Sequence, residues 1–155
     1  MIDELNIKLI QELQNDGRES YTQLAKKFGV SEGTIRRRVR ELQKHDVMKI
    51  RAVVNNDKIG YGFVSVMALQ VNLADLRKVA DILAGKPNIR YLALVAGRYD
   101  MVAIVMDQTP KGLSDFIRDH ISTIPGIIRI ETFVNLETIK NPWLETWDIV
   151  QLLGS

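Results

Sequence analysis

Residues 20–42 read SYTQLAKKFGVSEGTIRRRVREL and contain the clearest structural signals in the first half of the chain. Ser20 and Gln23 have the S-x-x-Q spacing of a capping box, in which each side chain bonds the backbone N–H of the other residue. Gly29 follows the last apolar residue of this segment and is a helix stop signal. The spacing therefore predicts a short helix of about eight residues that begins after Ser20.

A second helix is predicted directly after a tight turn. Ser31 is a candidate N-cap. An apolar stripe with i, i+4, i+7 spacing follows it, made of Ile35, Val39 and Leu42. This stripe predicts a helix over about 32–44. Two short helices that are joined by three to four residues including a glycine form the helix-turn-helix pattern.

A further helix is predicted on the N-terminal side of this pair. Asp3 is a good N-cap, and Gly17 in NDGR is a stop signal. Between them lie apolar residues at helical spacing, namely Leu5, Leu9, Ile10 and Leu13. The first half of the chain is therefore expected to be a three-helix unit.

The segment after the third helix favours a change of structure and then a domain boundary. Residues 47–55, VMKIRAVVN, are rich in β-branched residues and predict a strand that would give the helical unit a wing. NNDKIGYG then brings turn formers and two glycines. We expect a winged helix-turn-helix domain over 1–54 and a linker over 55–61.

Residues 62–140 show an alternation of strand-like and helix-like segments. The predicted strands are 63–72, 89–97, 101–107 and 126–139, and the predicted helices are 75–85 and 109–123. The order βαββαβ predicts a ferredoxin-like domain, so the whole chain is expected to be α+β. Helices would cover one face of its sheet, and the other apolar face would be covered by dimerisation.

The last segment, 141–155, is too apolar to remain exposed to water. Its large apolar side chains are Trp143, Leu144, Trp147, Ile149, Val150, Leu152 and Leu153. We expect this tail to pack on a neighbouring subunit, and a chain truncated after Lys140 should then lose part of its assembly on size-exclusion chromatography.

Positive charge is concentrated in and just after the third predicted helix. From Arg36 to Arg51 there are seven Lys/Arg and two Asp/Glu, a balance of +5 in 16 residues, whereas the whole chain carries only +2. A field of this kind attracts polyanions, although it is also compatible with a solvated helix face. Projection at about 100° per residue divides the basic residues among different faces of the helix. Arg37, Arg40 and Lys44 lie opposite the apolar stripe, whereas Arg38 lies near the seam with the preceding helix.

In helix-turn-helix proteins the N-terminal part of the second helix meets the base edges, and residues farther along reach phosphates. The candidate base-proximal residues are Ser31, Gly33, Thr34, Arg36 and Arg37. Tyr21 and Thr22, at the start of the preceding helix, are further candidate DNA-binding residues. Arg40 and Lys44 are better placed for phosphates. Gly33 would let the helix approach DNA closely. For Arg38 the pattern leaves open a phosphate contact and a pair with a carboxylate or a helix-end carbonyl.

Several other classes of protein have no support in the sequence. There is no cysteine and no apolar run of roughly 18 residues, and the N-terminus shows no signal-like pattern. The two histidines, His45 and His120, have no ligand spacing, so we expect no metal, no cofactor and no catalytic residue. A cytoplasmic binding protein without enzymatic activity is the expectation.

The chain as a whole resembles the Lrp/AsnC (feast/famine) family of transcriptional regulators. The segments that carry the resemblance are DGRESYTQLAKKFGVSEGTIRRRVREL, IRAVVNNDKIGY, VAGRYDMVAIV and STIPGIIRIETFVNLETIK, in this order, and the match covers about residues 2–140. Two positions depart from the family pattern. Asn6 stands where an aspartate is usual, and Asp46 stands where a glycine is usual after the third helix.

The resemblance implies dimers that assemble into tetramers, octamers or larger rings, and a small effector, commonly an amino acid, that binds between dimers. The effector-binding residues that it implies are Leu94, Gly97, Arg98, Tyr99, Asp100, Thr132, Phe133 and Val134. In chemical terms Asp100 could pair with an α-ammonium group, while Tyr99 and nearby backbone amides could position a carboxylate. The alternative is that Gly97 only makes the turn and Asp100 only caps it.

Three functions remain open at this point. The leading one is a sequence-specific regulator that binds double-stranded DNA and responds to an effector. The second is an architectural protein that wraps DNA with little sequence preference, which a small specificity ratio would reveal. The third is an enzyme similar to the sirohaem decarboxylases, which reuse this architecture. The second half shows no dedicated pocket histidine to support the enzyme.

Overall fold

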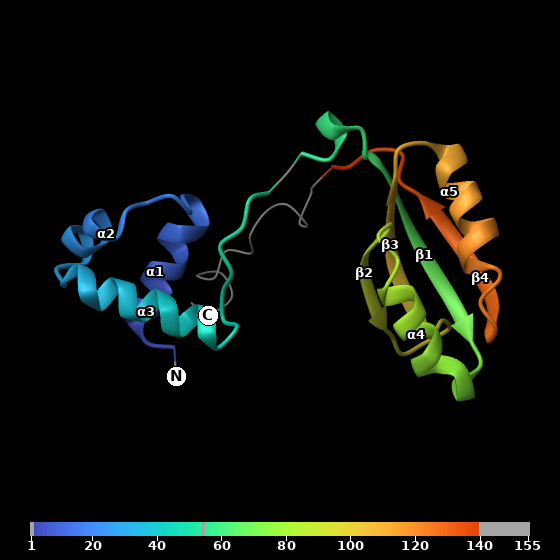
Figure 1. Cartoon of the computed structure of the whole chain (residues 1–155), viewed down its shortest axis with the longest axis horizontal. Coiled ribbons are helices and arrows are strands. Elements are labelled where there is room, and N and C mark those ends of the chain that lie inside the picture. Colours follow the sequence, from blue (N-terminus) through green and yellow to red (C-terminus); the bar gives the residue numbers. More distant parts are fainter. Residues whose placement is uncertain (1, 54, 140–155) are drawn as a thin grey trace. The chain divides into compact units, whose positions relative to one another are not determined.

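The structure is a computed structural model of the chain, and it describes residues 2–53 and 55–139. These residues form two compact units, 2–53 and 55–139. Figure 1 shows the first unit in blue to cyan and the second in green to orange-red.

The first unit consists of three helices. They are α1 (Glu4–Asn15), α2 (Tyr21–Phe28) and α3 (Glu32–Lys44). Each begins at the N-cap that the sequence predicts, because the side chains of Asp3, Ser20 and Ser31 accept backbone N–H groups of the first turns. The capping box of Ser20 and Gln23 is present in both directions. Gly29 ends α2 with a φ of 65°, a left-handed conformation that favours glycine.

The apolar stripes of the three helices meet in one small core. Its fully buried side chains are Leu9, Leu24, Ile35 and Val39. Ala25 is also buried there, and its small side chain allows α2 to approach its neighbours closely. The core therefore fixes the angle between α2 and α3, on which the geometry of a helix-turn-helix depends.

The end of α3 is a Schellman motif with an unusual residue in it. The N–H of Val47 donates to the carbonyl of Leu42 at 2.9 Å, and the N–H of Asp46 donates to the carbonyl of Gln43 at 3.1 Å. Asp46 lies at the position that turns left-handed, with a φ of 55°. It is the only non-glycine residue with positive φ in the described part of the chain.

Replacing Asp46 with glycine is expected to raise the free energy of unfolding by about 1 kcal/mol, because glycine adopts this φ without steric strain. The ion pair that would be lost, Asp46 to Lys49 at 3.0 Å, joins two largely exposed side chains and contributes little. Chemical denaturation provides the measurement. Asp46→Ala is the matched control, since it removes the same ion pair and keeps the strain. Equal stability of the two variants would mean that the positive φ at position 46 causes no strain.

The strand predicted over 47–55 is absent, since residues 47–53 have no strand structure. The β-branched composition of this segment favours an extended backbone. A strand also needs a second strand to pair its N–H and C=O groups, and none lies alongside it within the described residues. The linker predicted over 55–61 contains one short turn of 3₁₀ helix, η1 (Asp57–Ile59).

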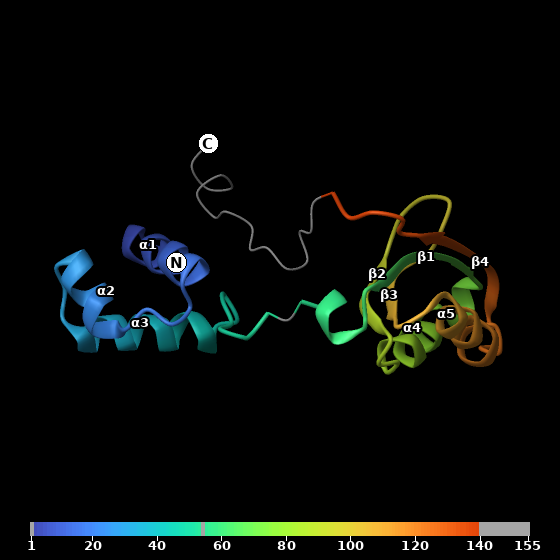
Figure 2. The same ribbon diagram turned by 90° about the horizontal axis from the view of Figure 1, so that it is seen from above.

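The second unit is a four-stranded antiparallel sheet with helices on one face. Its strands are β1 (Phe63–Val71), β2 (Ile89–Leu94), β3 (Met101–Asp107) and β4 (Ile127–Val134), in the order β2-β3-β1-β4. Its helical elements are η2 (Leu73–Asp75), α4 (Leu76–Ala84), α5 (Pro110–Phe116) and the π-helical turn η3 (Ile117–Ile121). Figure 2 shows α4 and α5 on the same side of the sheet. The predicted βαββαβ arrangement is confirmed.

Three element ends differ from the prediction. Strand β2 ends at Leu94, and the chain then forms the loop that contains Gly97, whose φ is 141°. The predicted helix over 109–123 is regular only in its first part and ends as the π-helical turn. Strand β4 ends at Val134, which pairs with Ser65 of β1, and beyond it the Asn135 N–H donates to the Val64 carbonyl at 3.0 Å.

The two faces of the sheet have different environments. Met67 and Leu69 of β1 point to the helices and are fully buried with Val79 and Leu83 of α4. Successive residues of a strand face opposite ways. Val66, Ile104 and Phe133, which are register partners across β1, β3 and β4, therefore lie on the open face. Phe133 is 52% exposed there, so this face presents apolar surface.

Candidate nucleic-acid interface and effector site

The N-terminus of α3 is held by its own polar side chains. Ser31 Oγ accepts the Thr34 N–H at 3.1 Å, and the two hydroxyl groups lie 2.9 Å apart. Ser31 is exposed and Thr34 is half-buried. Both predicted contact residues therefore help to build the helix end that would meet DNA.

Glu32 links the two helices of the helix-turn-helix, which the prediction from sequence missed. One of its carboxylate oxygens accepts the Thr22 hydroxyl at 2.8 Å, and the other pairs with Arg36 Nη2 at 2.6 Å. The Arg36 guanidinium lies over the Tyr21 ring, 5.5 Å from its centroid. The i, i+4 spacing of Glu32 and Arg36 is visible in the sequence, but the contacts with α2 depend on the turn.

Gly33 is exposed on α3, and the protein has room for a side chain at this position. A Cβ on Gly33 would meet only Ser31 Oγ, at 3.8 Å, which is ordinary van der Waals contact. Glycine in a helix is less stable than alanine by about 0.5–1 kcal/mol. No contact within the described unit explains why the less stabilising glycine stands here. Close approach of another molecule to this surface would explain it.

Three basic residues of α3 point away from the core, as the helical projection predicts. Arg37, Arg40 and Lys44 are all exposed. None of them pairs with a carboxylate among the described residues. Their charges are therefore available to phosphates and base edges.

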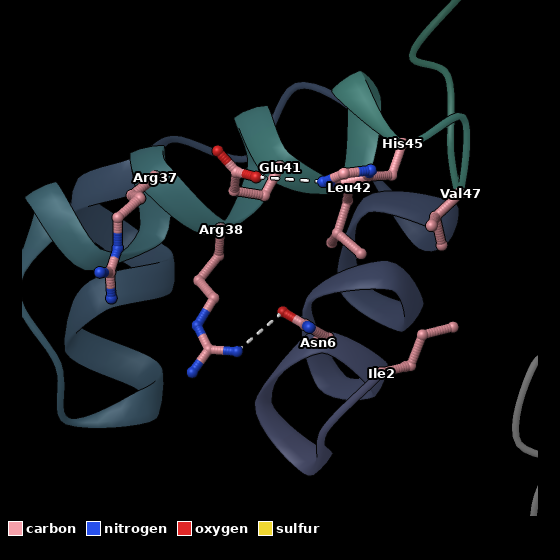
Figure 3. Close-up of a pocket in the computed structure, with 8 residues that line it drawn as sticks. All are labelled: Ile2, Asn6, Arg37, Arg38, Glu41, Leu42, His45 and Val47. Carbon is pink, nitrogen blue, oxygen red and sulfur yellow. Dashed lines mark hydrogen bonds and ion pairs between the residues drawn. The ribbon is translucent and has the colours of Figure 1, made fainter.

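Arg38 turns inward and is held by α1. Its Nη1 pairs with Asp3 Oδ2 and also donates to Asn6 Oδ1 at 3.3 Å, the contact drawn in Figure 3. The pKa of Asp3 is lowered, first by the backbone N–H of Asn6 and second by Arg38. Of the alternatives left open for Arg38, the structure supports the pair with a carboxylate. Its partners belong to α1, not to the seam with α2 that the projection indicated.

A hollow of about 520 Å³ lies between α1 and the part of α3 that begins at Arg37. Figure 3 shows the residues that line it: Ile2, Asn6, Arg37, Arg38, Glu41, Leu42, His45 and Val47. Asn6, one of the two departures from the family pattern, is buried at its wall. There it accepts from Arg38 while its own backbone N–H donates to Asp3 at 2.9 Å.

In the second unit, the loop that precedes β3 is fastened to the end of β1. Asp100 Oδ2 accepts the Val71 N–H at 2.8 Å, and the Asp100 N–H donates to the Leu69 carbonyl at 2.9 Å. Gln70 Nε2 donates to the Arg98 carbonyl at 2.9 Å. Asp100 therefore fastens the loop to β1, and any ligand would share its carboxylate with that strand.

Leu94 lies beside this loop, since it pairs with Met101 and the next residue, Val95, donates its N–H to the Asp100 carbonyl. The predicted effector residues of β4 are not brought together with the loop in one chain. Leu94 ends β2, one edge strand of the sheet, whereas Thr132, Phe133 and Val134 belong to β4, the other edge strand. The loop lies at the end of β1 that pairs with the start of β4. Thr132 follows Ile127 by five residues, which is about 17 Å along the strand.

The side chains of this set also point to different faces. Thr132 pairs with Met67, which faces the helices, whereas Phe133 pairs with Val66 on the open face. Arg98 and Tyr99 contact each other, with the guanidinium 5.7 Å from the ring centroid. A site that used all of these residues would need more than one copy of the chain.

Comparison with known protein families matches both units. Residues 2–43 match the AsnC-type helix-turn-helix domain, and residues 62–142 match the Lrp/AsnC ligand binding domain. The chain belongs to the Lrp/AsnC family of transcriptional regulators. The expected function class is therefore confirmed, and the second unit is the ligand-binding domain of that family.

Similar Lrp/AsnC proteins carry names of the same kind. An HTH-type transcriptional regulator of Pyrococcus furiosus is 35% identical over 141 residues, which cover 90% of this chain and 95% of that protein. The HTH-type transcriptional regulator FL11 of Pyrococcus horikoshii is 32% identical over 140 residues, covering 90% and 92% of the two chains.

Solved structures of other Lrp/AsnC regulators have the same fold. AsnC of Escherichia coli superposes with a TM-score of 0.86 at 26% identity, covering 96% of this chain and 99% of that one. A transcriptional regulator of Neisseria meningitidis, solved as a complex with L-Met, has a TM-score of 0.86 at 20% identity, covering 99% and 100%.

The described part of this Lrp/AsnC chain has neither a metal-binding cluster nor a membrane-spanning helix. In residues 2–53 and 55–139, no group of three or more His, Asp or Glu side chains is placed to hold a metal ion. No helix in the same residues is long and apolar enough to cross a membrane.

Proposed function

We propose that this regulator reads a specific DNA sequence through the N-terminal half of α3, and that a small effector adjusts its DNA binding. The main support is one face of α3, where a glycine with space around it lies near basic side chains that have no carboxylate partner in the described residues. Gly33 leaves room for close approach, while Arg37 and Arg40 are exposed without a carboxylate partner in the described residues. The chain acts in this proposal by binding and not by catalysis, and it works in the cytoplasm, where it meets DNA.

The proposed DNA contacts fall into two groups. The start of the helix-turn-helix lies nearest the base edges, where Arg36 and Arg37 read the bases. The other residues of this contact surface are Tyr21, Thr22, Ser31, Gly33 and Thr34. Phosphates are contacted farther along α3 by Arg40 and Lys44, which carry charge without sequence information. Arg38 is assigned to the α1 contact and not to DNA, because Asp3 and Asn6 already hold its guanidinium.

Selection from a random duplex library tests the first half of the proposal. The full chain is expected to enrich one motif, and a two-fold repeat in that motif is expected because dimers read two half-sites. A library that remains random after several rounds would favour the architectural, non-specific alternative.

The effector half of the proposal rests on the loop around Asp100. A carboxylate that accepts one backbone N–H through Oδ2 still has acceptor capacity for a ligand ammonium group. The Neisseria regulator with L-Met bound shows the same fold holding an amino acid. Because Asp100 and Thr132 are distant in one chain, we propose that the effector lies between copies.

Asp100→Asn is expected to abolish amino-acid binding while leaving the fold intact. Asparagine keeps an oxygen acceptor for the Val71 N–H but loses the charge that would pair with an α-ammonium group. Thermal shift against the twenty amino acids measures the loss. Asp81→Asn, at an exposed position of α4, is the matched control. A ligand-induced shift that survived in Asp100→Asn would contradict the role of the charge.

We propose further that dimers form through the open face of the sheet and then assemble into tetramers or octamers. Support comes from the apolar residues of that face, such as Val66, Ile104 and Phe133. The predicted tail over 141–155 lies outside the described residues.

A further inference from the structure

Arg36 and Arg37 are neighbours in sequence but are held very differently. Arg37 has no carboxylate partner among the described residues. Arg36 is held on two sides, by Glu32 Oε1 at 2.6 Å and by the Tyr21 ring at 5.5 Å. Glu32 is itself fixed to α2, because its second oxygen accepts the Thr22 hydroxyl at 2.8 Å.

The position of the Glu32 carboxylate is unfavourable for DNA binding. Glu32 places a negative charge in the first turn of α3, where a nucleic-acid surface would approach. The Thr22 hydroxyl and then Arg36 lower the pKa of Glu32, which favours the ionised carboxylate. An ionised carboxylate repels phosphates and weakens binding to any sequence. We therefore expect Glu32 to increase selectivity among DNA sequences, which would offset the weaker binding.

Glu32 can increase selectivity by fixing the orientation of the Arg36 side chain. A free arginine side chain has many rotamers, and ordering it opposes binding. The Arg36 guanidinium has five N–H donors, and Glu32 takes one of them through Nη2. The remaining donors include an adjacent pair, which matches the O6 and N7 acceptors of guanine in the major groove.

We propose that Glu32 is a specificity-determining positioning residue, which with Tyr21 and Thr22 aims Arg36 at a guanine. The inference rests on the proposed DNA-binding function and names one contact within it. A purely structural role for Glu32 is the competing explanation, because an acidic residue in the first turn stabilises a helix whatever its neighbours do.

The test is a double-mutant cycle on the full chain. The probes are the duplex enriched by selection from a random library and its single-base variants, with competition binding at one fixed salt concentration. Arg36→Ala is expected to lose discrimination at one guanine. Glu32→Ala is expected to lose about tenfold in discrimination at the same guanine and to bind random duplex at least as tightly as the parent chain. In the Arg36→Ala background, Glu32→Ala should change that discrimination no further.

Matched variants separate orientation from charge and from helix stability. Tyr21→Phe keeps the ring under Arg36 and should retain the guanine preference, whereas Tyr21→Leu should weaken it at the same position. Glu32→Gln removes the charge, keeps an oxygen that accepts from Arg36, and has an NH2 group that can donate to the Thr22 hydroxyl oxygen. Its discrimination should lie between those of the parent chain and Glu32→Ala. Thermal unfolding of each variant reports helix stability independently of DNA.

The outcomes are distinct. Unchanged discrimination in Glu32→Ala, or a further loss in the Arg36→Ala background, would overturn the positioning role. A lower melting temperature with intact base preference would leave Glu32 a helix-stabilising residue only. If the parent chain itself shows no base preference, the proposed function fails, and that result is seen before any variant is made.

Discussion

Replacing Arg37 with alanine is expected to relax base selection at one operator position by about 1–3 kcal/mol. Arg37 lies in the first half of α3, opposite the buried stripe, and is exposed with no carboxylate partner in the described residues. An arginine at this place can form two hydrogen bonds with a guanine edge, and its loss removes the preference for that base. Competition binding against single-base variants of the selected duplex is the measurement.

Arg40→Ala is the matched control, since it removes the same charged group one helical turn farther along. It should weaken binding to all sequences alike and lower the salt slope by about one unit, as expected for one phosphate contact. If both variants changed base preference and salt slope equally, Arg37 and Arg40 would not have separate roles in base and phosphate contacts.

Ile35→Ala is expected to lower the free energy of unfolding of the helical unit by about 2–5 kcal/mol. Ile35 is fully buried and lies in the core where α3 meets Leu24 of α2. The cavity left by the missing methyl groups would loosen the α2–α3 angle on which DNA reading depends. DNA binding should therefore fall together with stability.

The change in stability can be followed by chemical denaturation, with Ile59→Ala as the control. Ile59 is 56% exposed, so the same substitution there should change the free energy of unfolding by less than about 0.5 kcal/mol. Equal effects at the two positions would mean that the buried stripe of α3 does not hold the unit together.

The helices of the first unit could be predicted to within a residue because their signals are local. Ser20 with Gln23, Ser31 with the stripe from Ile35, and Gly29 each act within a few residues of the chain. Such caps and stripes fix where a helix begins, where it ends and which face it buries. The exposed face with Gly33 and Arg37 follows from the same projection.

Contacts between distant segments could not be predicted in this way. Arg38 is 35 residues from Asp3, and Asp100 is 29 residues from Val71. Nothing in either local pattern names those partners. The strand predicted over 47–55 was wrong for the same reason, because β-branched residues favour an extended chain but do not supply a second strand.

The effector set shows a different limit. The family resemblance groups Leu94, the loop at Gly97 and the stretch around Thr132, but the strand order β2-β3-β1-β4 separates the two edge strands. Only an assembly of chains could bring these residues together. The sequence of one chain contains the residues of such a site without the geometry that joins them.

If α3 reads a DNA sequence, the protein must bind one duplex far more tightly than others, and the ratio of the two affinities measures this. The measurement is the affinity of the full chain for its selected duplex relative to a scrambled duplex of the same composition, at near-physiological salt. For a sequence-specific regulator we expect a ratio of about 10³ or more. A ratio near one, with both duplexes bound equally and with equally steep salt dependence, would contradict it.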